Sequence, residues 1–266
     1  MSRWTTAVCE ANGIDIHVLR TGGAKPPLVL LHGLLGNGAC WTPVARALED
    51  EYDVVMPDAR GHGQSSAPLH GYRYDDHASD VIGLIQSLRL VSPLVLGHSM
   101  GGMTAAVVAS RLGDLLRGVI LVDPTFLSPE RQREVCDSDV ADQHRRLLKL
   151  SKAELLAQLR SRHARRSAEM LELLAEARRQ TRLSAFDVLT PPNPAYLELV
   201  RAIEIPILLA IGGDPVVSLE TARELQNLNP LVRVAQIAGA GHGLPFDQPE
   251  RLAEVVGSFI RSVTAS

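Results

Sequence analysis

The sequence has few cysteines, no long apolar run and almost no excess of charge. Its three cysteines (Cys9, Cys40 and Cys136) are widely spaced and form no C-x-x-C pair, so we expect no disulfide framework and a reducing, cytoplasmic setting. No apolar run is long enough to cross a bilayer, and the first residues lack the apolar segment of a secretory signal. The net charge of −3 gives no reason to expect nucleic acid or an acidic membrane surface as a partner.

Common nucleotide and metal motifs are absent as well. There is no G-x-G-x-x-G after the first apolar run, no P-loop and no H-E-x-x-H pair. The histidines are scattered without the spacing of metal ligands. We therefore expect neither a cofactor nor a metal ion, and a small molecule rather than a macromolecule as the partner.

Short, wholly apolar segments alternate with helical ones along most of the 266 residues. The apolar segments are residues 28–31, 54–56, 94–96, 119–122, 205–211 and 232–237, and the helical ones are 41–48, 74–88, 101–110, 218–228 and 249–262. Strands that are apolar on both faces are typical of a parallel sheet covered by helices. Two antiparallel strands joined at Ala11-Asn12-Gly13 are expected before them. The pattern predicts an α/β fold with a doubly wound, mostly parallel sheet.

One interval, residues 125–196, interrupts this alternation. It holds amphipathic segments rich in arginine and leucine and ends near Pro191-Pro192-Asn193-Pro194. We expect a helical cap here, inserted into a core made of residues 1–124 and 197–266. The cap would cover the carboxyl edge of the sheet, where open α/β folds place their ligands. The basic run at residues 160–166 is interpreted as a solvated helix face, because acidic residues are nearly as frequent in the interval.

A candidate nucleophile lies in Gly97-His98-Ser99-Met100-Gly101. This G-x-S-x-G pattern follows an apolar run and precedes a helix of small residues. A serine at such a strand-to-helix turn projects its hydroxyl from the fold, and the flanking glycines remove side chains that would clash. The context predicts that Ser99 is a catalytic nucleophile.

A serine nucleophile needs a base and a carboxylate that orients the base. Of nine histidines, six precede Ser99 and two lie in the predicted cap, which leaves His242 in a glycine-rich loop after the last apolar run. Asp214 and Asp123 each follow an apolar run and are both candidates for the acid. We prefer Asp214, with Asp123 as the alternative.

The oxyanion of a tetrahedral intermediate requires fixed donors. We expect the backbone N–H groups of Met100, directly after the nucleophile, and of Leu34, in the glycine-containing loop after the first apolar run, to supply them. An apolar acyl pocket is expected from residues near the same edge. Its candidate members are Leu34, Leu35, Trp41, Met100, Phe126 and Leu244.

These motifs together resemble the α/β-hydrolase superfamily. The resemblance runs from about residue 14 to 260 and rests on residues 32–36, 58–65, 97–101, 213–217 and 241–242. It implies a nucleophile at Ser99, a base at His242 and an acid at Asp214. The spacing Gly212-Gly213-Asp214 is one residue shorter than the common G-x-x-D, which keeps Asp123 as a candidate.

Fold and triad do not determine the substrate. The nucleophile position, at the strand-to-helix turn, holds a serine, which argues against dehalogenase and epoxide hydrolase chemistry, because those enzymes use aspartate there. The serine favours a carboxylesterase that acts on a small to medium, largely apolar acyl group. Lactonases, carbon–carbon bond hydrolases and hydrolase-like ligand receptors remain alternatives. Residues 32–41 are also similar to the menaquinone-pathway synthase of this fold, although the arginine typical of that family is absent from Gly102-Met103-Thr104. The sequence is compatible with a homodimer and does not specify the physiological substrate.

Overall fold

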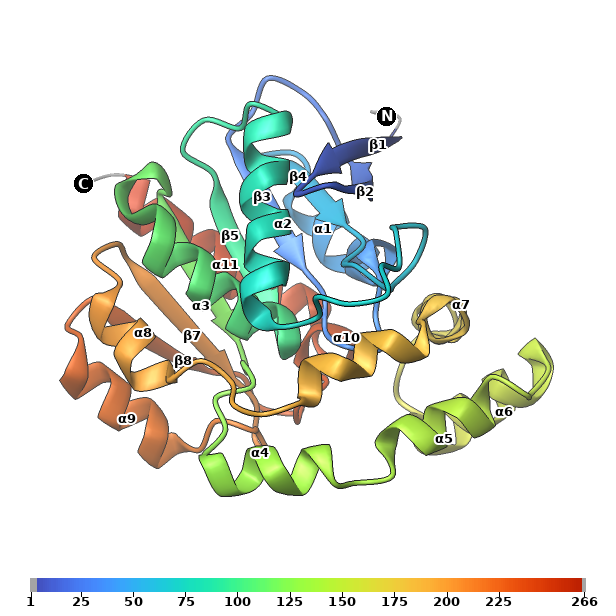
Figure 1. The fold of residues 1–266 in the computed structure, drawn as a ribbon. Coiled ribbons are helices and arrows are strands. Elements are labelled where there is room, and N and C mark those ends of the chain that lie inside the picture. Colours follow the sequence, from blue (N-terminus) through green and yellow to red (C-terminus); the bar gives the residue numbers. More distant parts are fainter. Residues whose placement is uncertain (1–3, 265–266) are drawn as a thin grey trace.

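A single eight-stranded sheet organises the protein, whose computed structural model describes residues 4–264. Its strands are β1 (Thr5–Ala11), β2 (Ile14–Arg20), β3 (Pro27–Leu31), β4 (Asp53–Pro57), β5 (Leu94–His98), β6 (Gly118–Val122), β7 (Ile207–Ile211) and β8 (Val232–Gln236). They are ordered β1-β2-β4-β3-β5-β6-β7-β8, and all neighbouring pairs from β4 to β8 are parallel. The doubly wound, mostly parallel sheet is therefore confirmed (Figure 1).

The N-terminal hairpin is the antiparallel part of the sheet. β1 pairs with β2, and β2 pairs antiparallel with β4. The turn between β1 and β2 places Asn12 at φ 52° and Gly13 at φ 75°. Left-handed backbone at both turn positions matches the twist of a two-residue hairpin, and Asn-Gly is the sequence that best tolerates it.

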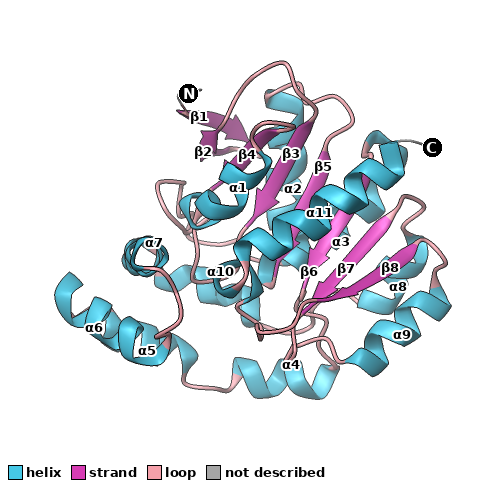
Figure 2. Ribbon diagram, turned by 180° about the vertical axis from the view of Figure 1, so that it is seen from behind, coloured by secondary structure: helices cyan, strands magenta, loops and turns pink. Residues whose placement is uncertain are grey.

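Helices cover both faces of the sheet. They are α1 (Thr42–Leu48), α2 (Tyr74–Ser87), α3 (Met100–Leu112), α8 (Tyr196–Ala202), α9 (Leu219–Leu228), α10 (Leu244–Asp247) and α11 (Pro249–Thr264), with short 3-10 helices η1 (Gly38–Trp41) and η2 (Gly113–Leu115). Figure 1 shows α2 and α3 in front of the sheet, and Figure 2 shows α1 and α11 on the opposite face. No helix within residues 4–264 combines the length and apolar character that a bilayer crossing needs.

Alternate residues of each central strand enter two separate cores. In β3, Val29 and Leu31 pack with α2 and α3, whereas Leu28 and Leu30 pack with α1 and α11. Strands β4 to β7 are buried along their whole length. Burial on both faces explains why these segments are apolar without alternation.

The interval between β6 and β7 is helical. It contains α4 (Pro129–Cys136), α5 (Val140–Leu147), α6 (Lys152–Arg162), α7 (Ala168–Gln180) and the 3-10 helix η3 (Leu183–Leu189). Figure 1 shows α4 to α7 beyond the ends toward which the parallel strands point. Leu155, Leu159, Met170 and Leu174 form a hydrophobic cluster of their own. We propose that residues 125–196 form a cap over the core of residues 1–124 and 197–266.

Candidate active site

Ser99 occupies the tight turn between β5 and α3. Its backbone has a φ of 55°, a left-handed conformation that a residue with a side chain rarely adopts and that marks strain at functional sites. A Cβ on Gly97 would overlap the carbonyl of Gly101, and a Cβ on Gly101 would overlap the carbonyl of Leu31. The two glycines of the motif are therefore required by backbone contact, and the turn exposes Ser99 at the carboxyl edge of the sheet.

His242 lies between Ser99 and a buried carboxylate. Its Nε2 is 3.0 Å from Ser99 Oγ, and its Nδ1 is 2.6 Å from Asp123 Oδ2. The His242 side chain is 41% exposed, whereas the Asp123 side chain is 0% exposed. The three side chains thus form one hydrogen-bonded series that begins in the protein interior and ends at an accessible hydroxyl.

The backbone around Asp123 fixes its carboxylate. The N–H groups of Val216 and Val217 donate to Oδ2 and Oδ1 at 3.0 and 2.9 Å. Asp123 itself has a φ of 39°, and a Cβ on Gly102 would lie only 2.9 Å from Pro124. The first turn of α3 and the end of β6 are therefore in close backbone contact, with Ser99 N also donating to Val122 O at 3.1 Å.

Asp214 takes a different position. It is exposed in the turn after β7, where it forms an isolated bridge with Gly241, and it lines the same cavity as Ser99. Within residues 4–264, His242 Nδ1 donates its hydrogen bond to Asp123, the alternative acid, and not to Asp214 as we expected. The reason is strand order, because β6 lies beside β5 whereas β7 is one strand further from Ser99.

The two residues expected to supply the oxyanion donors, Leu34 and Met100, both line the cavity at Ser99. Met100 is the first residue of α3, where the helix dipole favours negative charge. Leu34 lies in a turn closed by Gly36 N donating to Gly33 O at 2.9 Å. Leu34 and Met100 line one cavity with Ser99 and His242. Neither N–H donates a hydrogen bond within the described part of the chain, and we keep both as the proposed oxyanion donors.

Two buried histidines support the Leu34 loop, a role that sequence reasoning did not assign. His62 lies between two carbonyl oxygens, with its Nε2 against Leu34 O and its Nδ1 2.9 Å from Arg60 O, and the neutral ring donates to one of them. His32 Nδ1 donates to Gly33 O at 2.8 Å, and its Nε2 accepts the N–H of Ala59 at 2.9 Å. Burial lowers the pKa of His32 to about 4 and that of His62 to about 3. Both imidazoles are therefore neutral near pH 7, the state that lets His32 donate and accept at once.

The cavity at Ser99 has a volume of about 570 Å³. Apolar side chains from the core and the cap make up much of its wall, namely Leu34, Tyr74, Met100, Leu127, Val135, Val140, Val188, Leu189, Pro215 and Val216. Its polar members are Ser99, Thr125, Arg131, Gln132, Ser138, Asn193, Asp214 and His242. This volume is in the range of small-molecule sites.

Four of the expected pocket residues do not line this cavity. Trp41 and Leu244 are buried in the core beneath α1 and α11, and Phe126 stacks on Tyr196 with ring centroids 5.0 Å apart. Leu35 is half-buried in the turn after β3 but is not part of the wall. Trp41, Phe126 and Leu244 pack into the core instead, and cap residues such as Val135 and Val188 take the place expected for them.

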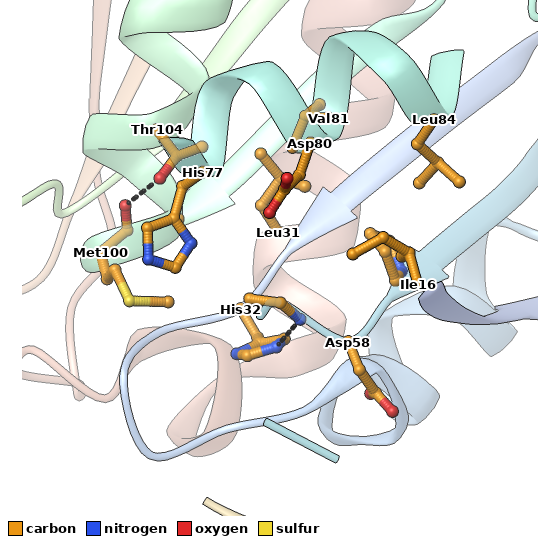
Figure 3. Close-up of a pocket in the computed structure, with 13 residues that line it drawn as sticks. Ile16, Leu31, His32, Asp58, His77, Asp80, Val81, Leu84, Met100 and Thr104 are labelled. Atoms are coloured by element: carbon orange, nitrogen blue, oxygen red, sulfur yellow. Dashed lines mark hydrogen bonds between the residues drawn. The ribbon is translucent and has the colours of Figure 1, made fainter. Parts of the chain in front are cut away.

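A smaller cavity of about 30 Å³ lies on the other side of Met100, between β3, α2 and α3 (Figure 3). His77 lines it, and burial lowers the pKa of His77 well below its ordinary value. This space holds about one water molecule and is too small for an acyl group.

Within residues 4–264, His, Cys, Asp and Glu side chains form no group of three or more that could hold a metal ion.

Comparison with known proteins agrees with this fold. Residues 26–249 match the family model of the alpha/beta hydrolase fold. The chain is 27% identical to a 2-(acetamidomethylene)succinate hydrolase from Mesorhizobium japonicum, over 91% of this chain and 90% of the relative. It is 29% identical to an N-formylmaleamate deformylase from Pseudomonas putida, over 94% of each chain. A solved structure of E-2-(acetamidomethylene)succinate hydrolase superposes with a TM-score of 0.85 at 24% identity, over 97% of this chain and 100% of that one. The chain belongs to the α/β hydrolase family.

Proposed function

We propose that this protein is a serine hydrolase that cleaves carboxylic esters with small to medium acyl groups through an acyl-enzyme. The observation that carries the proposal is the series of hydrogen bonds from Ser99 Oγ through His242 to Asp123, at 3.0 and 2.6 Å. In this assignment Ser99 is the nucleophile, His242 the base and Asp123 the acid. The partly apolar cavity of about 570 Å³ supports an uncharged acyl group.

Acylation begins when Ser99 Oγ attacks the carbonyl carbon of the substrate. His242 Nε2 takes the hydroxyl proton, while Asp123 holds Nδ1–H and stabilises the imidazolium. The carbonyl oxygen becomes an oxyanion that accepts hydrogen bonds from the N–H groups of Leu34 and Met100. When the intermediate collapses, the bond to the leaving group breaks and His242 passes its proton to that group.

Deacylation repeats the same steps with water. A water molecule gives a proton to His242 and attacks the acyl carbon, and the returning proton restores the Ser99 hydroxyl as the acid leaves. His242 is accessible enough for water to reach it, because its side chain is 41% exposed. The reaction consumes one water molecule and needs no further reactant.

Amide hydrolysis is the second candidate. The names of the two relatives above refer to an acetamido compound and to an N-formyl compound. The same nucleophile, base and oxyanion donors serve for an amide, provided that His242 protonates the departing nitrogen. The polar residues of the cavity wall, among them Arg131, Gln132 and Asn193, offer hydrogen-bonding groups that a simple apolar ester would not use.

Purified protein should be tested on p-nitrophenyl acetate and butyrate, on p-nitroacetanilide, and on a panel of lactones and carbon–carbon bond substrates. We expect turnover of the short esters and stoichiometric labelling of Ser99 by a fluorophosphonate probe. The Ser99→Ala variant should lose both. Wild-type activity in Ser99→Ala would refute the nucleophile assignment, and faster turnover of the anilide than of the esters would favour the amide candidate. Binding of an ester without repeated turnover would support a receptor instead.

A further inference from the structure

Arg166, a cap residue, reaches the loop that carries His242. It lies in the turn between α6 and α7, and its side chain is only 8% exposed. Arg166 Nε donates to Asp247 Oδ1 at 2.7 Å, and its Cζ lies 5.4 Å from the centroid of the Phe246 ring. Both partners belong to α10, which begins two residues after His242. An arginine buried to this degree contributes more than an exposed surface ion pair.

The guanidinium also contacts the backbone next to His242. A Cβ on Gly243 would overlap Arg166 Nη2 and would lie 3.0 Å from Asp247 Oδ2. The carbonyl of Gly243 accepts the N–H groups of Phe246 and Asp247 at 2.9 and 3.0 Å. Gly243 is therefore contacted from two sides, and Arg166 touches the backbone that joins His242 to the short helix α10.

Phe246 extends the same contact to the residue before the nucleophile. Its ring meets the edge of His98 at 5.5 Å between centroids, and His98 lies 4.9 Å from the His242 ring. His98 Nε2 donates to the carbonyl of His242 at 2.7 Å. Burial and the neighbouring His242 lower the pKa of His98 to about 3, so His98 is neutral and uses its one N–H for this bond.

We propose that Arg166 is a positioning residue, which holds the His242 loop against Ser99 when the cap is seated on the core. The proposal rests on the proposed function, because it assigns His242 as the base. Arg166 is not part of the wall of the Ser99 cavity. It acts through Asp247, Phe246 and Gly243, so the catalytic step depends on a cap contact that the substrate does not touch.

The test compares kcat and KM for p-nitrophenyl acetate in Arg166→Met, Arg166→Lys, Asp247→Asn and the double variant Arg166→Met/Asp247→Asn. We expect Arg166→Met to lower kcat by roughly 10- to 100-fold, the size of effect that a small misplacement of a catalytic group produces, with KM changed by less than about 2-fold. Arg166→Lys should recover part of the loss. The double variant should be no worse than Arg166→Met, since the two residues act as one unit.

Two matched controls lie nearby. Arg165, the preceding residue, is exposed, and Arg46 forms an exposed pair with Glu169 of α7 at 2.8 Å. Arg165→Met and Arg46→Met should leave kcat within about 2-fold of wild type, as expected for surface substitutions. A similar kcat for Arg166→Met and Arg165→Met would overturn the proposal, as would an effect on KM alone. If Arg166→Met does not fold, the kcat values of Asp247→Asn and Arg166→Lys are compared with those of the two control variants instead.

Hydrogen exchange separates this inference from the proposed function. Peptides covering residues 241–248 should exchange faster in Arg166→Met than in Arg165→Met, whatever reaction the protein catalyses. Unchanged exchange would refute the positioning role. If the wild-type protein is not labelled by the fluorophosphonate probe while exchange rises in Arg166→Met, the serine hydrolase assignment fails but the link from the cap to the His242 loop stands.

Discussion

Asp123 Oδ2 and His242 Nδ1 are 2.6 Å apart, and the same carboxylate accepts two backbone N–H groups from the loop after β7. The carboxylate is fully buried and receives three donors from two segments of the chain. A carboxylate fixed in this way presents one oxygen to the imidazole in a single orientation. It can therefore select the tautomer of His242 whose Nε2 is free to take a proton from Ser99.

Asp123→Asn should lower kcat for p-nitrophenyl acetate by about 10⁴-fold, because the amide cannot stabilise the imidazolium or enforce the tautomer. Asp214→Asn, in the exposed turn that lines the cavity, should cost less than about 10-fold. Steady-state kinetics on both variants, with circular dichroism to verify folding, makes the comparison. A loss in Asp214→Asn that equals or exceeds the loss in Asp123→Asn would restore Asp214 as the acid.

Local features made the sheet and the tight turn at Ser99 predictable. The tight turn at Ser99 needs a glycine at residues 97 and 101 because the backbone leaves no room for a Cβ. The two glycines can be recognised in the sequence as parts of the G-x-S-x-G pattern. The parallel strands are apolar on both faces because helices bury both. These two signals depend on neighbours within a few residues, whereas His242 was selected by elimination, from its place in the chain after the last apolar run.

The acid and the pocket depend on tertiary arrangement and could not be fixed in this way. Asp123 and Asp214 both end strands, and only the order of the strands and the conformation of the loop at Val216 decide which carboxylate meets His242. Trp41 resembles a pocket residue in sequence but is buried beneath α1, whereas Val188, in the cap, lines the cavity. Tertiary packing decides whether an apolar side chain points into the core or into the cavity. The periodicity of a short segment does not determine that direction.

Gly212→Ala should destabilise the protein far more than Gly213→Ala. A Cβ on Gly212 would lie 2.5 Å from Ala240 O and 2.6 Å from Gly241 O, whereas a Cβ on Gly213 would have only Ala240 O nearby, at 3.6 Å. Forcing a methyl group into such contact costs about 1–3 kcal/mol of unfolding free energy. Urea denaturation of the two variants measures the difference, and equal stabilities would show that the Ala240–Gly241 backbone yields without cost.

The buried ion pair of Arg60 and Asp80 should be needed for stability. Arg60 Nε donates to Asp80 Oδ2 at 2.6 Å, and the two side chains are 5% and 7% exposed. Asp80→Asn removes the counter-charge from buried Arg60 and should lower the free energy of unfolding by about 3–5 kcal/mol.

The matched control for this pair is Arg131 with Glu134, both more than 60% exposed. Glu134→Gln should change stability by no more than about 0.5 kcal/mol. Urea denaturation at pH 7 tests both variants under one condition. Comparable effects of Asp80→Asn and Glu134→Gln would mean that Arg60 is solvated or paired differently in solution.

Stability should fall as the pH drops from 7 to 5, before most carboxylates are protonated. Burial lowers the pKa of His32 to about 4 and those of His62 and His98 to about 3. Below the ordinary histidine pKa of about 6.5, the unfolded chain therefore binds protons that the folded protein does not. Unfolding then becomes more favourable with falling pH, by about 2 kcal/mol at pH 5 for each such histidine.

Urea denaturation at half-unit intervals between pH 7 and 5 measures this slope. In His32→Asn the slope should be shallower by one proton, because the residue that titrates only in the unfolded state is gone. His70 is exposed, so His70→Asn should leave the slope unchanged. A free energy of unfolding that stays constant from pH 7 to 5 in the wild-type protein would mean that His32, His62 and His98 accept protons in the folded state. The neutral hydrogen-bonding roles assigned to them around Leu34 and His242 would then be wrong.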